Sequence, residues 1–148
     1  MEYRTITREG IAAIVISGSK VLLLKRLPLP IITNPGIWSF IFGGRKKGES
    51  YLDAAYREIE EETGIERSDL RLLAKEMKVD LFDQRRRCMW QNRMFVFRST
   101  TEKVRKSLEN SAYRWAGIRD IRKHTNYTNI FIGEAKILHI IEGHINGK

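Results

Sequence analysis

The sequence predicts a single domain of the α/β class over residues 1–148, and three observations lead to this prediction. Short runs of apolar, β-branched residues bounded by turn residues recur along the chain and are typical of strands. A segment with helical periodicity interrupts these runs at residues 50–63, and a second amphipathic segment lies near the end of the sequence. The length is that of one domain, and neither an internal repeat nor a second domain is evident.

The first half of the chain is predicted to begin with a hairpin. Ile11–Ile16 and Val21–Lys25 are apolar runs on either side of Ser17-Gly18-Ser19, which is a turn signal. Three prolines within residues 27–36 predict a loop. Residues 37–42 then predict a short strand that leads into the helical segment.

The second half is predicted to contain three more strands and two helices. The expected strands are Leu70–Val79, Trp90–Arg98 and Tyr113–Ala116. A helical piece is expected at Ile118–His124. Asn129–Ile145 is expected to form an amphipathic helix, because its apolar residues recur with helical spacing.

The helical segment at residues 50–63 carries a cluster of acidic residues. Glu58, Glu61 and Glu62 are spaced so that they share one sector of a helix. Like charges at this spacing cost a few tenths of a kcal/mol per pair, so the cluster brings no structural gain. A hard divalent cation bound by oxygen ligands would offset the repulsion. The spacing therefore predicts a metal site.

Local signals define the two ends of this helix. Ser50, with Asp53 three residues later, is typical of an N-terminal cap. Gly64 follows the last helical residue, where a left-handed cap is favoured. Glu60 and Asp53 project away from the acidic sector and are expected to be solvated surface charges.

The segment also follows a specific pattern of fixed positions. It consists of Gly43, five residues, Glu49, seven residues, Arg57-Glu58-Ile59, one residue, Glu61-Glu62, one residue and Gly64-Ile65. This pattern resembles the Nudix box at every defined position, and the chain is therefore similar to Nudix hydrolases such as MutT. The resemblance implies an α/β/α sandwich with a mixed β-sheet. It also implies hydrolysis of a nucleoside diphosphate linked to another group.

The resemblance assigns roles to the residues of the box. It implies that Glu58 and Glu62 bind the metal most directly, that Glu61 assists, and that Arg57 orients these acids. The expected metal is Mg²⁺, with Mn²⁺ as a substitute. The alternative for Arg57 is a helix-stabilising ion pair with Glu61, four residues later.

The general base is left open between Glu58 and an acid in a later loop. Glu109 is the candidate for the loop acid, because it lies six residues before Trp115, a placement similar to that in some family members. Glu102 and Asp83 are the alternatives.

The loop before the helix departs from the family pattern. Ile41 and Phe42 stand where proline and the first glycine are common, and Lys46 stands where a glutamate is common. A backbone carbonyl of this loop usually joins the metal ligands in the family. Gly43 is the predicted source of that carbonyl, with Phe42 as the alternative.

Four residues near the box are candidate substrate contacts. Arg45, Lys46 and Lys47 make the loop cationic beside a site expected to hold phosphates, although a solvated turn would look the same. Trp38 precedes the box and would border a nucleobase pocket. The alternative is that Trp38 is a core residue.

Charge and composition bound the class of partner. The net charge of +9 favours anionic partners, and a small nucleotide is the expected one. Nucleic acid is the alternative partner, and Arg85–Arg87 would be its candidate contact. No apolar run reaches the ~20 residues of a membrane span. The N-terminus lacks the apolar stretch of a secretory signal, and the single Cys88 cannot form an internal disulfide. We therefore expect a cytoplasmic protein without a membrane partner. The sequence leaves the oligomeric state open, with a homodimer among the alternatives.

The choice of substrate rests on markers that the family carries downstream of the box. ADP-ribose hydrolases of the family tend to have a proline where this chain has Asp80 and Leu81. Dinucleoside-polyphosphate hydrolases tend to have a tyrosine where this chain has Phe82 and Asp83. By elimination, the first expectation is a (deoxy)nucleoside triphosphate pyrophosphatase of MutT type. The alternatives are an RNA 5′-end pyrophosphohydrolase or decapping-like enzyme, an ADP-ribose or nucleotide-sugar hydrolase, and a non-catalytic binding module.

Overall fold

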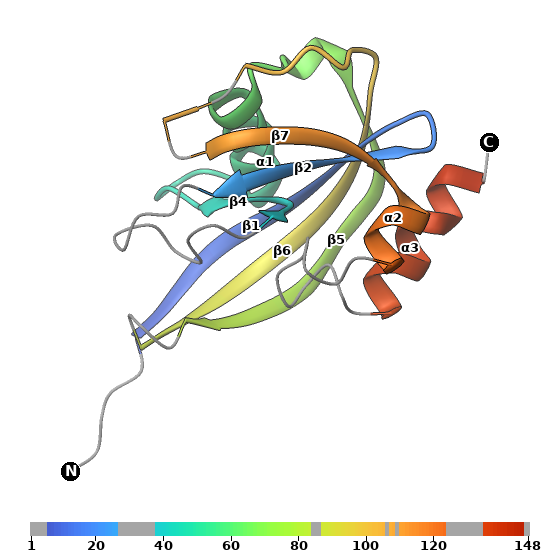
Figure 1. Ribbon diagram of the computed structural model, residues 1–148. Coiled ribbons are helices and arrows are strands. Elements are labelled where there is room, and N and C mark those ends of the chain that lie inside the picture. The colour runs from blue at the N-terminus through green and yellow to red at the C-terminus, as the bar shows by residue number, and fades with distance from the viewer. Residues whose placement is uncertain are drawn as a thin grey trace.

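The computed structural model describes residues 6–26, 38–83, 87–105, 107–108, 110–123 and 135–146. Within these ranges, seven strands form one mixed sheet in the order β3-β2-β1-β6-β5, with β4 paired to β1 and β7 paired to β2 (Figure 1). The strands are β1 (Ile6–Ser17), β2 (Lys20–Arg26), β3 (Trp38–Ser39), β4 (Ile41–Gly44), β5 (Leu70–Asp83), β6 (Cys88–Ser99) and β7 (Asn110–Gly117). The helices are α1 (Tyr51–Thr63), α2 (Ile118–Lys123) and α3 (Ala135–Asn146), with a short 3₁₀ turn at Arg67–Asp69.

Strand β1 lies at the centre of the sheet. It runs parallel to β6, from the pair Ile6–Cys88 to the pair Ile16–Arg98, and antiparallel to β2 and β4. The predicted hairpin is confirmed, since Ile16 pairs with Val21 and Gly18 takes a positive φ of 58° in the turn. The strand begins five residues earlier than predicted, since residues 6–9 also pair with β6. The sequence pattern missed them because they are exposed and do not form an apolar run.

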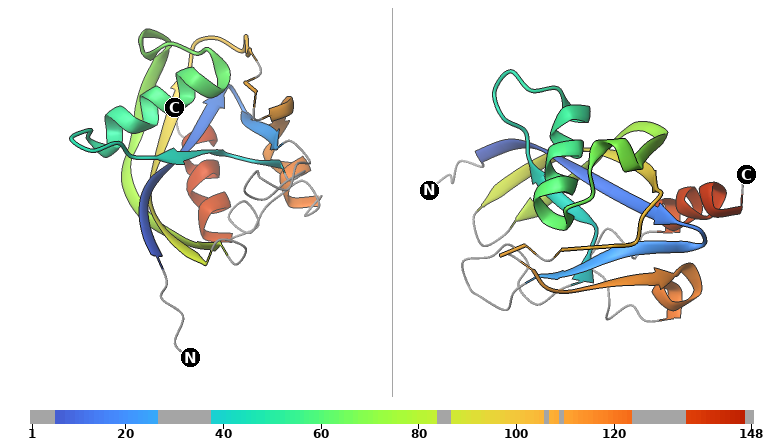
Figure 2. Two further views of the ribbon diagram at one scale, coloured as in Figure 1. Left: turned by 90° about the vertical axis from the view of Figure 1, so that its left-hand side faces the viewer. Right: turned by 90° about the horizontal axis from the view of Figure 1, so that it is seen from above.

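The core consists of two layers on opposite faces of the sheet. Alternate residues of β1 point to opposite faces. Ile11, Ala13 and Val15 pack with helix α1, whereas the intervening even-numbered residues pack with α2 and α3. Figure 2 shows α1 and α3 on opposite sides of the sheet. The predicted α/β/α sandwich is therefore confirmed, and burial on both faces explains why this strand is a continuous apolar run.

The strand predicted at residues 37–42 is divided in two. β3 pairs with β2, through Ser39 and Leu24, whereas β4 pairs with β1, through Ile41 and Ala13. β1 and β2 are paired with each other only next to their turn. The chain therefore changes partner at the buried Phe40, and β4 continues to Gly44, where the predicted metal-bearing loop begins.

The remaining predicted strands and helices occur with shifted ends. β5 and β6 pair antiparallel up to Asp83 and Cys88. The arginine-rich loop predicted between them includes residues 84–86, which lie outside the described ranges. The proline-containing loop, His124 and residues 129–134 also lie outside them. None of the helices that the structure describes combines the length and apolar character needed to span a membrane.

Candidate active site

Helix α1 begins and ends where its sequence predicts. The Ser50 hydroxyl accepts a hydrogen bond of 3.0 Å from the Asp53 backbone N–H. Gly64 has a φ of 78°, and its N–H donates to the Glu60 carbonyl at 2.8 Å. Glycine enters this left-handed region without the strain that a side chain would bring. The two caps therefore fix the ends of a helix that packs against β4 through Glu58.

Glu58 lies directly against the backbone of β4. A β-carbon at Gly43 would come within 2.1 Å of Cδ and 2.4 Å of Oε1 of Glu58, so only glycine allows this approach. Burial raises the pKa of Glu58 to about 7, Arg57 opposes the rise, and the carboxylates of Glu61 and Glu62 add to it. The three acids therefore lie close enough to repel one another, as their spacing predicts.

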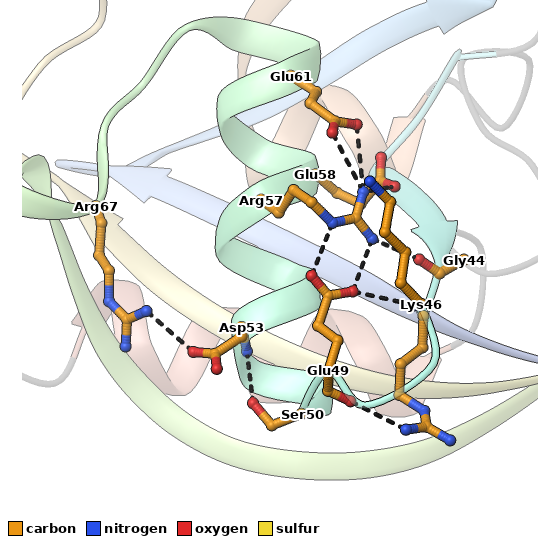
Figure 3. A network of polar contacts seen from close by, with 10 residues as sticks. Gly44, Lys46, Glu49, Ser50, Asp53, Arg57, Glu58, Glu61 and Arg67 are labelled. Carbon is orange, nitrogen blue, oxygen red and sulfur yellow. Dashed lines mark hydrogen bonds and ion pairs between the residues drawn. The ribbon is translucent and has the colours of Figure 1, made fainter.

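Arg57 is the centre of a polar network between the helix and the loop (Figure 3). Its Nε and Nη2 donate to the two oxygens of Glu49 at 2.8 and 2.9 Å. Its Nη1 donates to Glu58 at 2.8 Å and to Glu61 at 3.3 Å. Nη2 also donates to the Gly44 carbonyl at 2.8 Å. Arg57 therefore contacts two predicted metal ligands and ties them to the loop, which is what the predicted orienting role requires.

Glu49 was not among the predicted site residues, although it occupies a fixed position of the box. The two-bond pairing with Arg57 holds the pKa of Glu49 at about 2, against the smaller opposing effect of burial. Its carboxylate also accepts the Lys46 backbone N–H at 3.0 Å. Glu49 thus stays ionised and fixes both the guanidinium and the loop. The fixed spacing of eight residues between Glu49 and Arg57 in the box is the sequence signal that could have indicated this pairing.

Glu62 is held by residues from a different part of the chain. It is 6% exposed, and its Oε2 accepts hydrogen bonds from the Ser107 hydroxyl at 3.1 Å and from the Asn110 amide. Ser107 lies in the loop that precedes β7, and Asn110 is the first residue of β7. No local pattern in the sequence links Asn110 to a helix 48 residues away.

The three predicted basic residues of the loop have different surroundings. Arg45 donates to the Glu9 carboxylate through Nε at 2.9 Å and to the Glu49 carbonyl at 2.9 Å, and it lies over the Tyr51 ring. Lys46 and Lys47 are exposed, and the Lys46 side chain extends alongside the guanidinium of the central arginine in Figure 3. The lysines are thus better placed than Arg45 to reach a phosphate.

Two further predictions concern residues that lie apart from this network or outside the described ranges. Trp38 is partly buried and packs against the core layer that includes α3, on the other face of the sheet from α1. Glu109 lies outside the described residues. The alternative loop acid, Glu102, accepts a bond from Ser17 and lies 3.9 Å from Lys20, at the end of β1 that is remote from β4.

The donors present suit a hard divalent cation. Within the described ranges, no three acidic, histidine or cysteine side chains are arranged as a ready metal site. Each predicted ligand faces a protein donor instead, Arg57 for Glu58 and Glu61, and Asn110 for Glu62. The close approach of Gly43 and the oxygen-only donor set nevertheless fit Mg²⁺ chemistry. Gly43 contacts Glu58, whereas Phe42 packs toward the opposite core layer.

Comparison with known proteins places this site in a family. The sequence model of the NUDIX domain matches residues 7–137. The chain therefore belongs to the NUDIX family, as the box predicts, and this family generally uses divalent metal ions.

Curated relatives match over about half of the chain. The RNA pyrophosphohydrolase of Pelagibacter ubique (strain HTCC1062) is 41% identical over 64 residues, which are 43% of this chain and 38% of the relative. The RNA pyrophosphohydrolase of Campylobacter jejuni subsp. jejuni serotype O:23/36 (strain 81-176) is 36% identical over 75 residues, which are 47% of this chain and 45% of the relative. The matched segments thus span less than half the length of these relatives.

Solved structures match over almost the whole chain. A Caenorhabditis elegans Ap4A hydrolase complex has a TM-score of 0.78 at 17% identity and covers 95% of this chain and 99% of its own. The MutT protein of Methanosarcina mazei Go1 has a TM-score of 0.72 at 21% identity and covers 99% and 100%. At these identities the likeness establishes the fold.

Proposed function

We propose that this protein is a Mg²⁺-dependent hydrolase that removes pyrophosphate from the 5′-triphosphate end of RNA. Family membership and the names of the relatives support an enzyme that hydrolyses phosphorus-containing anhydrides. The names also favour RNA over the free nucleoside triphosphates that the sequence markers suggest. A MutT-type pyrophosphatase, which releases a nucleoside monophosphate and pyrophosphate, is the second candidate.

The network around Arg57 is the observation that carries the hydrolase assignment. Glu58 and Glu62 would hold the cation, and Glu61 and the Gly43 carbonyl would complete its protein ligands. A bound divalent cation neutralises phosphate charge and lowers the pKa of a coordinated water. The protein orients Glu58 through Arg57 and gives it room through Gly43. The proton of the attacking water would pass to Glu58 or to the loop acid Glu109.

A hollow beside the loop supports a substrate longer than one nucleotide. It has a volume of about 470 Å³ and is lined by Thr7, Arg8, Glu9, Gly44, Arg45, Trp90 and Gln91. The indole of Trp90 lies over Gly10 and Gly44, which have no side chains to cover it. Like Trp38, Trp90 packs against the core layer opposite α1, so the hollow would hold a part of the substrate that extends past the loop. Arg8 is exposed and makes no ion pair within the described part of the chain. An indole face and a guanidinium suit a nucleobase and a backbone phosphate.

The decisive experiment compares two substrates with the same enzyme and Mg²⁺. A 5′-triphosphorylated RNA oligonucleotide labelled at its γ-phosphate should release labelled pyrophosphate, with a kcat/KM above that of each free nucleoside triphosphate. Arg8→Ala should lower kcat/KM for the RNA and leave that for free triphosphates close to wild type. A higher kcat/KM for free nucleotides would favour the MutT-type candidate. Activity on neither substrate would overturn the proposal.

A further inference from the structure

We propose that Asn110, together with Ser107, positions Glu62 for the metal, and that the Asn110 carbonyl oxygen accepts a hydrogen bond from the cation's hydration shell. This inference rests on the proposed metal-dependent activity. It adds to the site two residues that lie outside the Nudix box.

The three side chains form a closed ring of hydrogen bonds. Asn110 Nδ2 donates to Glu62 Oε2 and also to Ser107 Oγ, at 3.0 Å for the latter. Ser107 Oγ donates in turn to the same Glu62 oxygen at 3.1 Å. Both of these bonds to Glu62 end on Oε2, and together they restrict the orientation of the carboxylate. Hydrogen-bond partners that orient a ligating carboxylate in this way typically strengthen metal binding.

The chemistry of the ring fixes the orientation of the Asn110 amide. A rotated amide would place its carbonyl oxygen against the Glu62 carboxylate, so that two acceptors would face each other. The amide nitrogen therefore faces Glu62, and Oδ1 points elsewhere. Asn110 is only 5% exposed, and its Oδ1 is buried without a hydrogen-bond partner in the described part of the chain.

Asn110 Oδ1 is a buried acceptor next to Glu62, a predicted metal ligand, and this indicates that its hydrogen-bond donor arrives with the cation. Buried polar groups are nearly always hydrogen-bonded, so an unmet carbonyl oxygen calls for an explanation. Mg²⁺ retains several of its waters when a protein binds it, and each of these waters is a hydrogen-bond donor. A water on the cation would supply the donor that Asn110 Oδ1 lacks.

A purely structural role for Asn110 is the competing explanation. The same loop is attached to α1 independently, because the Arg105 backbone N–H donates to the Thr63 carbonyl at 2.7 Å. Asn110 itself belongs to β7, where it pairs with Arg26 of β2. The backbone thus already fixes this segment, and the side-chain contact with Glu62 serves to orient the carboxylate.

The test measures Mn²⁺ binding by electron paramagnetic resonance on the full chain without substrate. Asn110→Ala should weaken Mn²⁺ affinity roughly 10–100-fold, as is usual for residues that orient metal ligands. Ser107→Ala should weaken it less, because it removes one of two donors. Asn92→Ala is the matched control, since Asn92 is buried to the same degree but lies beside Gly10. This control should bind Mn²⁺ as wild type does.

The outcomes separate this inference from the proposed function. If wild type and Glu62→Gln both fail to bind Mn²⁺, the metal-dependent function is wrong. If Glu62→Gln abolishes binding while Asn110→Ala and Ser107→Ala match wild type, only the positioning role is wrong. An equal loss in Asn92→Ala would also overturn it, because the effect would then be general. Urea unfolding of each variant identifies any that fail to fold, and Ser107→Ala decides the matter if Asn110→Ala does not fold.

Discussion

A β-carbon at Gly43 would lie 2.1 Å from Cδ of Glu58, whereas one at the adjacent Gly44 would meet its nearest neighbour, Trp90, at 3.9 Å. The two glycines face opposite sides of β4. The first lies against the buried carboxylate of Glu58 on α1, and the second lies against an indole at ordinary van der Waals distance. Only the first position therefore requires the absence of a side chain.

This difference predicts opposite results for two alanine variants. Gly43→Ala should displace the Glu58 side chain, reduce hydrolysis severely and lower the free energy of unfolding by roughly 1–3 kcal/mol, as overpacking does. Gly44→Ala should keep near wild-type stability and near wild-type hydrolysis of free nucleoside triphosphates, which do not need the hollow at Trp90. Steady-state hydrolysis and urea unfolding check both expectations. Equal activity in the two variants would contradict the importance of this contact.

Replacing single acids of α1 by glutamine tests the assignment of the metal ligands. Glu58→Gln and Glu62→Gln should lower kcat on the order of 10²–10⁴-fold, because each removes a charge from the metal site while keeping the size of the side chain. Glu60→Gln is the matched control on the exposed face and should be close to wild type. Circular dichroism verifies that all three variants fold. A control as impaired as Glu62→Gln would refute the division of the helix into two faces.

The sequence was sufficient to predict features that depend on short spacings. The caps of α1, its acidic sector and the continuous apolar run of β1 each follow from residues within a few positions of one another. The ion pair between Arg57 and Glu61 follows in the same way.

Features that depend on distant pairing were not predictable. The break at Phe40 arises because the chain changes partner there, from β2 for β3 to β1 for β4, which no local pattern encodes. The contact of Asn110 with Glu62 depends on the register between β2 and β7. Arg45 looks like a phosphate contact in sequence, but its guanidinium binds Glu9, which lies 36 residues earlier.

The pairing of Glu49 with Arg57 predicts a specific dependence of stability on pH. Because the pKa of Glu49 in the folded protein is about 2, below its ordinary value of 4.5, the pair stabilises the fold above pH 4.5 and loses this effect as pH falls toward 2. Glu49→Gln should therefore lower the free energy of unfolding at pH 6 by roughly 1.5–3 kcal/mol, the usual range for bonds to charged groups. The difference from wild type should shrink at pH 3, as measured by urea unfolding.

The control for this prediction is an exposed pair between the same helix and the 3₁₀ turn that follows it. Asp53 pairs with Arg67 at 3.0 Å, and both side chains are more than half exposed. Asp53→Asn should change stability by less than about 1 kcal/mol, because exposed pairs are screened by solvent. A loss as large as that of Glu49→Gln would show that burial does not distinguish the two pairs.

The positive charge of the chain can be assigned by comparing two groups of basic residues. Lys46 and Lys47 are exposed in the loop that Glu49 and Arg57 hold, so we expect them to contact the phosphates that are hydrolysed. Replacing both with alanine should raise KM for RNA and for free nucleoside triphosphates alike. Arg85–Arg87 precede β6, and the first two lie outside the described residues. Changing these three to alanine should affect RNA alone and should flatten the salt dependence of RNA binding.

Steady-state kinetics at several salt concentrations separate the two groups. Each lost phosphate contact should reduce the slope of log affinity against log salt by roughly 0.7, the value for single strands. A triple arginine variant with an unchanged slope would show that these arginines do not bind the RNA backbone. Equal KM values for wild type and the double lysine variant would show that the loop does not bind phosphate. The basic loop next to α1 would then be a solvated turn, and the hollow at Arg8 would become the principal candidate for the phosphate contacts.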